Sequence, residues 1–379
     1  MPQPIRRYLA PFAAITLSLL SAAWLTACPF DGGRPSLERQ AAQLLMLGFR
    51  GKTVAEAATI LADIRERRIG GVIVYDRDVA LGTTRNVESP QQLATLIDGL
   101  QTASGGRLLV AIDQEGGLVN RLKTTYGFPP THSAQYFGDL NDPAATRAEA
   151  DQTAALLRSL GINLNFAPVV DLNVNPQSPA IGAVQRSYSA DPGVVVTHAS
   201  QVIQAHRAHG VRTALKHFPG HGSASADSHL GFTDVTQSWS ATELEPYRWL
   251  VADGLADLVM TAHIYNAQLD AEYPATLSRA VMTGLLREEI GFRGVIVSDD
   301  MQMGAITQYH GLEQALELSL NAGVDLLIFA NNLVYEPDIG ERAVEIIVRL
   351  VEQGRVPKAR LREAHDRVCG LKRELGLKC

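Results

Sequence analysis

Eight short runs of apolar residues recur along the chain, each followed by a polar or amphipathic stretch. Most are continuous in Val, Ile and Leu rather than alternating, as expected for parallel strands that are buried on both faces. Eight such strand–helix units predict a single-domain α/β protein with a (β/α)8 TIM-type barrel, and a doubly wound open sheet is the alternative. The runs are 43–49, 69–75, 108–113, 162–172, 211–217, 258–265, 295–299 and 324–330.

Helical stretches are expected between these runs, for example at 144–160 and 311–322, and two amphipathic stretches, 340–352 and 358–375, end the chain. The 379 residues are 46% hydrophobic and 20% charged, so there is ample chain to bury a core. The formal net charge is -6 and no dense block of Lys and Arg occurs. We therefore expect no nucleic-acid partner.

The amino terminus has the pattern of an export signal. Arg6 and Arg7 precede an apolar stretch at 8–25, which ends in LTAC and looks like a bacterial lipobox with Cys28 as the lipidated residue. A plain secretory peptide needs no cysteine there, and an uncleaved membrane helix is the other alternative. We expect an exported protein, lipid-anchored to a cell-envelope membrane on the periplasmic or outer surface. The predicted division is a lipoprotein signal peptide at 1–27, a tether at 28–35 and a catalytic barrel at 36–379.

Lipidation of Cys28 would leave Cys369 and Cys379 as the remaining thiols. In an oxidising compartment these two could pair and close a small loop at the carboxyl end. Cys369 is equally compatible with a buried position on a helix. Both possibilities stay open at the level of sequence.

Polar residues of unusual kinds fall where the strand candidates end. Since barrel enzymes place their chemistry at the carboxyl ends of the strands, this distribution favours the barrel over the open sheet. The residues are Asp113, Asp171, Lys216, His217, His263, Asp299 and Asn331.

The segment 216–232 reads KHFPGHGSASADSHLGF and is the most distinctive part of the sequence. In a tight loop the carboxylate of Asp227 could accept a hydrogen bond from the imidazole of His229, fixing its tautomer and moving its pKa toward the working pH. A solvated turn is the plain alternative. His217 and His221 have the spacing of a helical metal pair, but the Pro and Gly between them disfavour a helix, so we expect no metal.

Two further segments bring charged residues to strand ends. In GVIVSDDMQM, at 294–303, Asp299 could be a nucleophile, a metal ligand or a cap, and Asp300 suits a helix cap. Only one of this pair should face the barrel mouth, because consecutive strand residues point to opposite faces. In AIDQEGGLVNRL, at 111–122, Asp113 and Arg121 offer an acceptor and donors for hydroxyl groups, or simply an ion pair within the turn.

Taken together, these motifs resemble the bacterial β-N-acetylglucosaminidases of glycoside hydrolase family 3. The resemblance covers residues 36–375 and rests on DQEGG, NFAPVVD, KHFPGHG with DSH downstream, PATLS and SDDMQM, in this order and spacing. It implies that Asp299 is the nucleophile and that His229 is the acid/base, oriented by Asp227. It also implies a pocket for the terminal sugar made by Asp113, Arg121, Arg186, Lys216 and His217.

The sequence departs from the family pattern at three places. Leu118 follows EGG where the family usually has Arg, the stretch 181–186 is longer than usual, and a lipobox is unusual in a family best known for cytoplasmic cell-wall recycling. The longer stretch makes Arg186 the weakest of the implied sugar contacts.

The resemblance implies a retaining exo-glycosidase that releases terminal β-linked N-acetylglucosamine from peptidoglycan fragments or chito-oligomers through a covalent glycosyl-enzyme. A histidine acid adds no second carboxylate beside the nucleophile. Family members that act on glucosides take their acid from a glutamate on a second domain, which we do not expect here, and Glu115 is interpreted as a turn residue. The alternatives are a phosphorylase and a non-catalytic glycan-binding surface lipoprotein. We expect a monomer without a cofactor.

Overall fold

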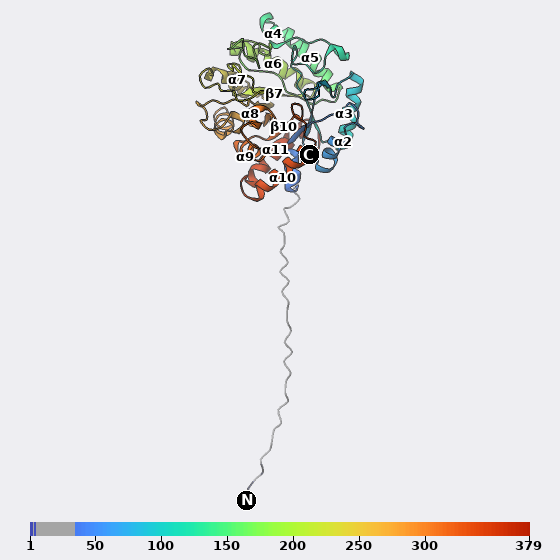
Figure 1. The fold of residues 1–379 in the computed structure, drawn as a ribbon, viewed down its shortest axis with the longest axis vertical. Helices are drawn as coiled ribbons and strands as arrows, with labels where there is room; N and C mark the ends of the chain where they lie inside the picture. The colour runs from blue at the N-terminus through green and yellow to red at the C-terminus, as the bar shows by residue number, and fades with distance from the viewer. Residues whose placement is uncertain (3, 5–34) are drawn as a thin grey trace. The chain divides into compact units, whose positions relative to one another are not determined.

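The computed structural model describes residues 1, 2, 4 and 35–379 (Figure 1). The chain divides into two units, Met1–Pro35 and Ser36–Cys379. Cys28 and the apolar stretch before it lie outside the described residues, so the predicted lipidation site has no structural counterpart. Within the described part of the chain, no helix is both long and apolar enough to cross a membrane.

Residues 36–379 form a closed barrel of parallel strands surrounded by helices (Figure 1). The barrel closes where β1 pairs with both β2 and β10, at Met46 with Gly71 and at Leu45 with Leu327. Closure confirms the predicted (β/α)8 fold and excludes the open doubly wound sheet. Around the barrel the strands are β1 (Leu45–Gly48), β10 (Leu326–Phe329), β9 (Val295–Asp300), β8 (Leu258–Thr261), β7 (Arg212–Phe218), β6 (Leu164–Asn165), β5 (Leu109–Ile112) and β2 (Gly71–Val74).

Each predicted run overlaps one strand of the barrel; β7 and β9 extend one residue past their runs, and the other strands are shorter than theirs. The largest difference is in the run 162–172, where only β6 is regular strand. Pro168 has no N–H to donate to a neighbouring strand, so the regular ladder stops before it. Beyond it, a single bridge between Val169 and Lys216 brings Asp171 up to the mouth of the barrel.

Helices cover the outside of the barrel, and the four predicted stretches correspond to α5, α9, α10 and α11. The start of α5 has the usual signals of a helix N-terminus. Asp142 Oδ1 accepts a hydrogen bond from Ala144 N at 2.9 Å, and Pro143 occupies the first turn. The α-helices are α1 (Leu37–Gln43), α2 (Ala58–Ala62), α3 (Pro90–Ser104), α4 (Ala134–Leu140), α5 (Pro143–Ser159), α6 (Pro192–Ala208), α7 (Glu245–Ala252), α8 (Gly304–Thr307), α9 (Leu312–Ala322), α10 (Ile339–Glu352) and α11 (Lys358–Glu374). Two π-helical segments, Asp63–Arg67 and Ala280–Glu289, and a small hairpin of β3 (Arg77–Asp78) and β4 (Thr83–Thr84) complete the regular elements used here.

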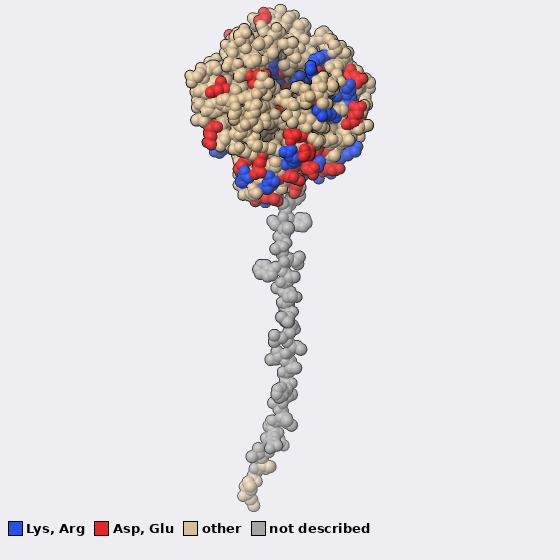
Figure 2. Space-filling model, in the orientation of Figure 1, with Lys and Arg blue, Asp and Glu red and all other residues tan. Residues whose placement is uncertain are grey.

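The core has two layers. One lies between the strands and the surrounding helices, and the other fills the barrel interior with side chains such as Met46, Leu109, Phe166 and Leu326. The interior layer is therefore packed, and it supports the mouth from below. On the face shown in Figure 2, basic and acidic side chains are interspersed over the lower and right-hand parts of the domain.

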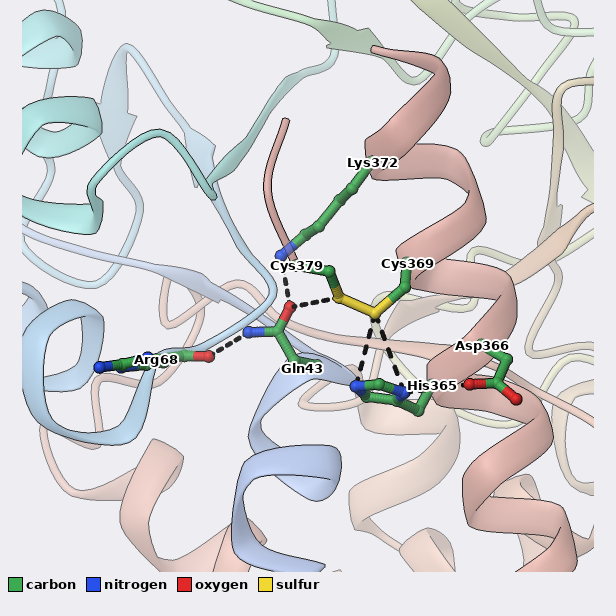
Figure 3. The surroundings of a disulfide bond; sticks show 7 residues. All are labelled: Gln43, Arg68, His365, Asp366, Cys369, Lys372 and Cys379. Atoms are coloured by element: carbon green, nitrogen blue, oxygen red, sulfur yellow. Dashed lines mark hydrogen bonds and ion pairs between the residues drawn. A yellow bond between two sulfur atoms is a disulfide. The ribbon is translucent and has the colours of Figure 1, made fainter. Parts of the chain in front are cut away.

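Helix α11 closes the floor of the barrel, where the strands begin. Val368 and Leu371 enter the interior core, and Lys372 Nζ donates to Gln43 Oε1 at 2.5 Å just before β1. Cys369 forms a disulfide with Cys379, with 5.4 Å between their Cα atoms (Figure 3). Both sequence-based possibilities for Cys369 are therefore realised, because it is a buried helix residue and also paired.

Candidate active site

An open cavity of about 230 Å³ lies at the carboxyl ends of the strands. Its walls are formed by the loops after β2, β5, β6, β7 and β10 and by the ends of β7, β8 and β9, so it occupies the end where barrel enzymes bind substrates. All of the residues implied by the family resemblance line it except Asp227, which lies behind His229. Its walls are made by Tyr75, Val79, Asp113, Glu115, Val119, Arg121, Arg186, Lys216, His217, His229, Met260, Asp299, Asp300, Ala330, Asn332 and Leu333.

Asp299 is the second-to-last residue of β9, and its side chain is partly exposed to the cavity. Its Oδ1 accepts a hydrogen bond from the backbone N–H of Asp300 at 2.8 Å. Burial would raise the pKa of Asp299, but nearby His263, His217 and His229 lower it to about 2. The carboxylate is therefore ionised at neutral pH, which is the state that a nucleophile requires.

Asp300 is not a helix cap, contrary to expectation. Its Oδ1 accepts backbone hydrogen bonds from Gln302 N at 3.1 Å and Ala330 N at 2.9 Å, whereas Met303 is the N-cap residue of α8. Asp300 thus ties the end of β9 to the end of β10, and burial raises its pKa to about 6. Both residues line the cavity, but only Asp299 is partly exposed there, because the buried carboxylate of Asp300 is held by backbone N–H groups.

Asp227 and His229 form the hydrogen-bonded pair that their spacing predicts. His229 Nδ1 lies 2.7 Å from Asp227 Oδ1, which also accepts the backbone N–H of His229 at 3.0 Å. Burial would lower the pKa of His229, but the hydrogen bond to Asp227 and the negative charge of Asp299 raise it. The same hydrogen bond lowers the pKa of Asp227 to about 2. The pair is an imidazole with a permanently anionic partner.

The loop that bears this pair folds over the end of β9. Gly304 N donates to His229 O and Ala305 N donates to Ser228 O, each at 3.3 Å, so the first turn of α8 holds the loop. The side chain of His229 remains 49% exposed. His229 and Asp299 consequently line one cavity, with the histidine on a loop and the aspartate on the barrel itself.

The opposite wall is a network of buried ion pairs centred on Lys216. Its Nζ lies 2.8 Å from Asp113 Oδ1 and 2.6 Å from Glu115 Oε1. Burial would raise the pKa of Glu115, but the charges of Arg186 and Lys216 hold it well below its ordinary value. Glu115 therefore stays ionised and lacks the proton that an acid catalyst needs. It is more than a turn residue, since it anchors two cations.

Arg186 reaches the cavity but most of its donors are already used. It donates to both carboxylate oxygens of Glu115, at 2.7 and 2.8 Å, and to Ala180 O at 2.9 Å. A further guanidinium N–H approaches His217 Nε2 at 3.2 Å. The arginine thus acts chiefly on its neighbours, which fits its standing as the weakest of the implied sugar contacts.

His217 is oriented by Asp171. Its Nδ1 lies 2.7 Å from Asp171 Oδ2, so Nδ1 donates to Asp171 while Nε2 accepts from Arg186. His221 follows in a loop and points its backbone N–H at Asp171 Oδ1, at 2.8 Å. Over residues 35–379, the cluster of three potential metal ligands that the structure contains is at the floor, where it consists of His365 and the two disulfide cysteines.

Arg121 is the cation in the cavity wall that is most available to a ligand. It lies 3.7 Å from Asp113, a loose ion pair, and its buried Nε has no hydrogen-bond partner among the described residues. Leu118, at the position where the family pattern has Arg, is 66% exposed, and its neighbour Val119 lines the cavity. The turn that carries Val119 and Arg121 therefore offers a ligand both a hydrogen-bond donor and an apolar surface.

Sequence reasoning gave no role to several residues that shape the site. His263 Nε2 lies 3.0 Å from Asp300 O, and its Nδ1 lies 2.8 Å from Thr276 Oγ1 in the PATLS motif. PATLS therefore orients a buried histidine that helps to lower the pKa of Asp299. Asp171 and Glu115 lie within the motifs NFAPVVD and DQEGG, which was the available signal for them.

Comparison with known sequences gives a consistent result. Residues 36–371 match the profile of the Glycosyl hydrolase family 3 N terminal domain. A beta-hexosaminidase from Tolumonas auensis is 36% identical over 293 residues, which cover 76% of this chain and 83% of that protein. Beta-hexosaminidase A from Pseudoalteromonas piscicida is 33% identical over 326 residues, covering 79% of this chain and 54% of that protein.

Solved structures are similar over most of the chain. A family 3 beta-N-acetylglucosaminidase from Paenibacillus sp. str. FPU-7 superposes with a TM-score of 0.82 at 32% identity, covering 90% of this chain and 63% of that one. A Beta-N-acetylhexosaminidase from Beutenbergia cavernae gives 0.80 at 30% identity, covering 89% of this chain and 99% of that one. The fold and the motifs at the barrel mouth therefore point to the same group of proteins.

Proposed function

The chain belongs to glycosyl hydrolase family 3, and from this we propose that it is a retaining exo-β-N-acetylglucosaminidase that hydrolyses terminal β-linked N-acetylglucosamine. The main support is one arrangement, in which ionised Asp299 lines the same cavity as His229, whose imidazole is paired with Asp227 behind it. The named activities of the relatives support the substrate class. Peptidoglycan fragments and chito-oligomers are the proposed natural glycans.

In the first proposed step, Asp299 attacks the anomeric carbon. The bond from that carbon to the leaving oxygen breaks, and His229 gives its proton to this oxygen. A covalent glycosyl-enzyme forms, with neutral His229 beside it. The raised pKa of His229 supports its role as the proton donor, and the low pKa of Asp299 supports its role as the nucleophile.

In the second proposed step, His229 takes a proton from water as the water attacks the anomeric carbon. The sugar is released with retained configuration, and Asp299 and protonated His229 are restored. Asp227 stays ionised throughout and stabilises the imidazolium. In this scheme Arg121, Lys216, Asp113 and His217 bind the hydroxyls of the terminal sugar, with Arg186 behind them.

A β-N-acetylglucosaminide phosphorylase remains the second candidate, because a histidine acid/base does not repel an incoming phosphate as a carboxylate would. The half-exposed position of His229 is compatible with either acceptor. A purely glycan-binding role is disfavoured because both Asp299 and the dyad have the geometry and ionisation needed for catalysis.

The decisive assay compares three aryl substrates in parallel: the β-N-acetylglucosaminide, the β-N-acetylgalactosaminide and the β-glucoside. We expect strong turnover of the first, weaker turnover of the second and almost none of the third, with rates independent of added phosphate. Preferred cleavage of the glucoside would contradict the proposed substrate. Production of N-acetylglucosamine 1-phosphate would show that the reaction is phosphorolysis and not hydrolysis. Inactivity on all three substrates would support the glycan-binding role.

We propose further that the protein is exported, that a lipid on Cys28 anchors it to a cell-envelope membrane, and that it acts as a monomer. The basic and apolar residues before LTAC support export, and the Cys369–Cys379 disulfide suits an oxidising compartment. Metabolic labelling with an alkyne fatty acid should mark the full-length chain, and Cys28→Ala should remove the label. Equal labelling of the variant would exclude this anchor.

A further inference from the structure

Exposed aromatic and aliphatic side chains gather beside the loop that holds His229. The ring centroid of Phe232, three residues after the histidine, lies 5.3 Å from that of Tyr265 and 5.6 Å from that of Tyr309. Phe232 is 47% exposed, Tyr309 is 57% exposed and Leu230 is 79% exposed. Large apolar side chains that cluster at a surface commonly mark a binding site.

These rings come from three consecutive loops of the barrel. Phe232 follows β7, Tyr265 follows β8 and Tyr309 follows α8, which itself comes after β9. The polar wall of the cavity arises chiefly from the loop after β5 and from strand β7 itself, where Asp113 and Lys216 meet. The aromatic cluster of Phe232, Tyr265 and Tyr309 therefore lies on the side of His229, outside the set of residues that line the cavity.

The position of the cluster is fixed by the same contacts that hold the acid/base loop. Besides the backbone bonds from Gly304 and Ala305, Gln308 Nε2 donates to Leu230 O at 3.1 Å. Tyr265 is held in turn by its hydroxyl, which donates to Ala271 O at 3.0 Å. These contacts therefore hold the three aromatic rings in place beside the loop that carries His229.

The chemistry of the reaction identifies what can lie there. His229 must reach the oxygen that links the terminal sugar to its neighbour, so the neighbouring group begins immediately beyond the histidine. A pyranose ring presents axial C–H groups on its faces, and these pack favourably on an aromatic ring that would otherwise meet water. The exposed rings of Phe232 and Tyr309 are a matching surface.

We propose that Phe232 and Tyr309 form a subsite for the sugar on the leaving side of the cleaved bond. This inference rests on the proposed glycosidase activity and deepens it, because it names the residues that bind the second sugar ring of the proposed oligosaccharide substrates. Contact with this ring contributes binding energy that is used in the transition state, so its loss lowers kcat/KM.

The test compares two substrates that differ on the leaving side. N,N′-diacetylchitobiose has a sugar ring there, whereas β-N-acetylglucosaminyl fluoride has only a fluorine atom. For Phe232→Ala and Tyr309→Ala we expect the ratio of kcat/KM for the disaccharide to that for the fluoride to fall about tenfold. Phe232→Trp should keep the ratio, because it retains an aromatic face.

Tyr136→Ala is the matched control, since Tyr136 is a 45% exposed tyrosine on α4 that packs on His132 and does not line the cavity. Its ratio should equal that of the parent protein. An unchanged ratio in Phe232→Ala and Tyr309→Ala would overturn the subsite, and so would a parallel loss on both substrates, because a contact with the leaving sugar cannot act on the fluoride. A shifted alkaline limb of the kcat/KM profile in either variant would also overturn it, because the lower ratio would then come from a displaced His229. A parent protein inactive on both substrates would instead overturn the proposed function.

Discussion

The two ends of the barrel use buried charges in different ways. At the floor, Asp325 is fully buried and is held by Arg287, Arg360 and Arg367 at 2.5, 2.6 and 3.1 Å, and it also accepts Ile296 N at 3.0 Å. At the mouth, Glu115 and Asp113 share Lys216 in a similar network. That network, however, borders an open cavity that also contains ionised Asp299 and half-exposed His229.

The difference shows what separates a structural charge from a functional one in the same fold. Around Asp325 every charged neighbour is another protein group, so the cluster joins α11 to the strands and closes the floor. Around Asp299 the neighbouring charges set ionisation states but leave the carboxylate accessible. Substitutions in the charge cluster at the floor should therefore lower the free energy of unfolding, and substitutions of charged residues at the mouth should lower kcat.

The largest expected effect is at the nucleophile. Asp299→Ala should lower kcat by at least about ten-thousandfold, because no other carboxylate in the cavity wall is placed to form the covalent intermediate. Its free energy of unfolding should stay within about 1 kcal/mol of the parent or rise, since functional residues are often not optimal for stability. Steady-state kinetics and urea unfolding measure the two. Substantial retained kcat would remove Asp299 from its proposed role.

The second prediction concerns the acid/base. His229→Ala should lower kcat/KM by about a hundredfold to ten-thousandfold on chito-oligomers, whose leaving oxygen needs a proton. The loss should be far smaller on an aryl substrate with an acidic phenol as the leaving group. Parallel kinetics on both substrates provide the check. Full activity of the variant on chito-oligomers would show that the Asp227–His229 pair is not the acid/base.

The third prediction tests the floor. Asp325→Asn should lower the free energy of unfolding by about 3–5 kcal/mol, because it leaves three buried or partly buried arginines short of their counter-charge. Urea titration gives the stability, and kcat per folded molecule should not change. Asp338→Asn is the control, since Asp338 is mostly exposed and only 3.9 Å from Arg342, so its loss should cost less than about 1 kcal/mol.

The smallest expected effect is a shift in pH dependence. His229 must be protonated to donate, so kcat/KM should fall as pH rises through its raised pKa, while Asp299, with a pKa of about 2, stays ionised over the whole working range. Asp227→Asn removes the anion that raises the pKa of His229, so the alkaline limb of the kcat/KM profile should move to lower pH.

The control for this shift is Asp234→Asn, which makes the same change at an exposed loop residue whose side chain accepts a hydrogen bond from Thr236 N. Its alkaline limb should coincide with that of the parent. An alkaline limb unmoved in Asp227→Asn would mean that Asp227 does not set the ionisation of the acid/base.

Much of the fold was readable from the sequence because buried parallel strands leave a strong local signal. Runs such as 324–330 (VDLLIFA) and 295–299 (VIVSD) are mostly apolar, and the observed strands β10 and β9 coincide with them to within two residues. The run 162–172 was less informative, since Pro168 and the bridge at Val169 depend on the neighbouring strand β7. Asp300 was misread as a cap because its partner, Ala330 N, is distant in sequence.

The eight strand–helix units, the end of the barrel that bears the chemistry and the Asp227–His229 pair were predictable, because each leaves a pattern among residues close along the chain. The fold was needed to show that the barrel closes, that Glu115 anchors two ion pairs, that Asp171 orients His217, and that α8 holds the acid/base loop. These relations join separate strands and loops, and the charges they bring together set the pKa values. Burial and long-range electrostatics arise when the chain closes into a barrel, so no local pattern records them.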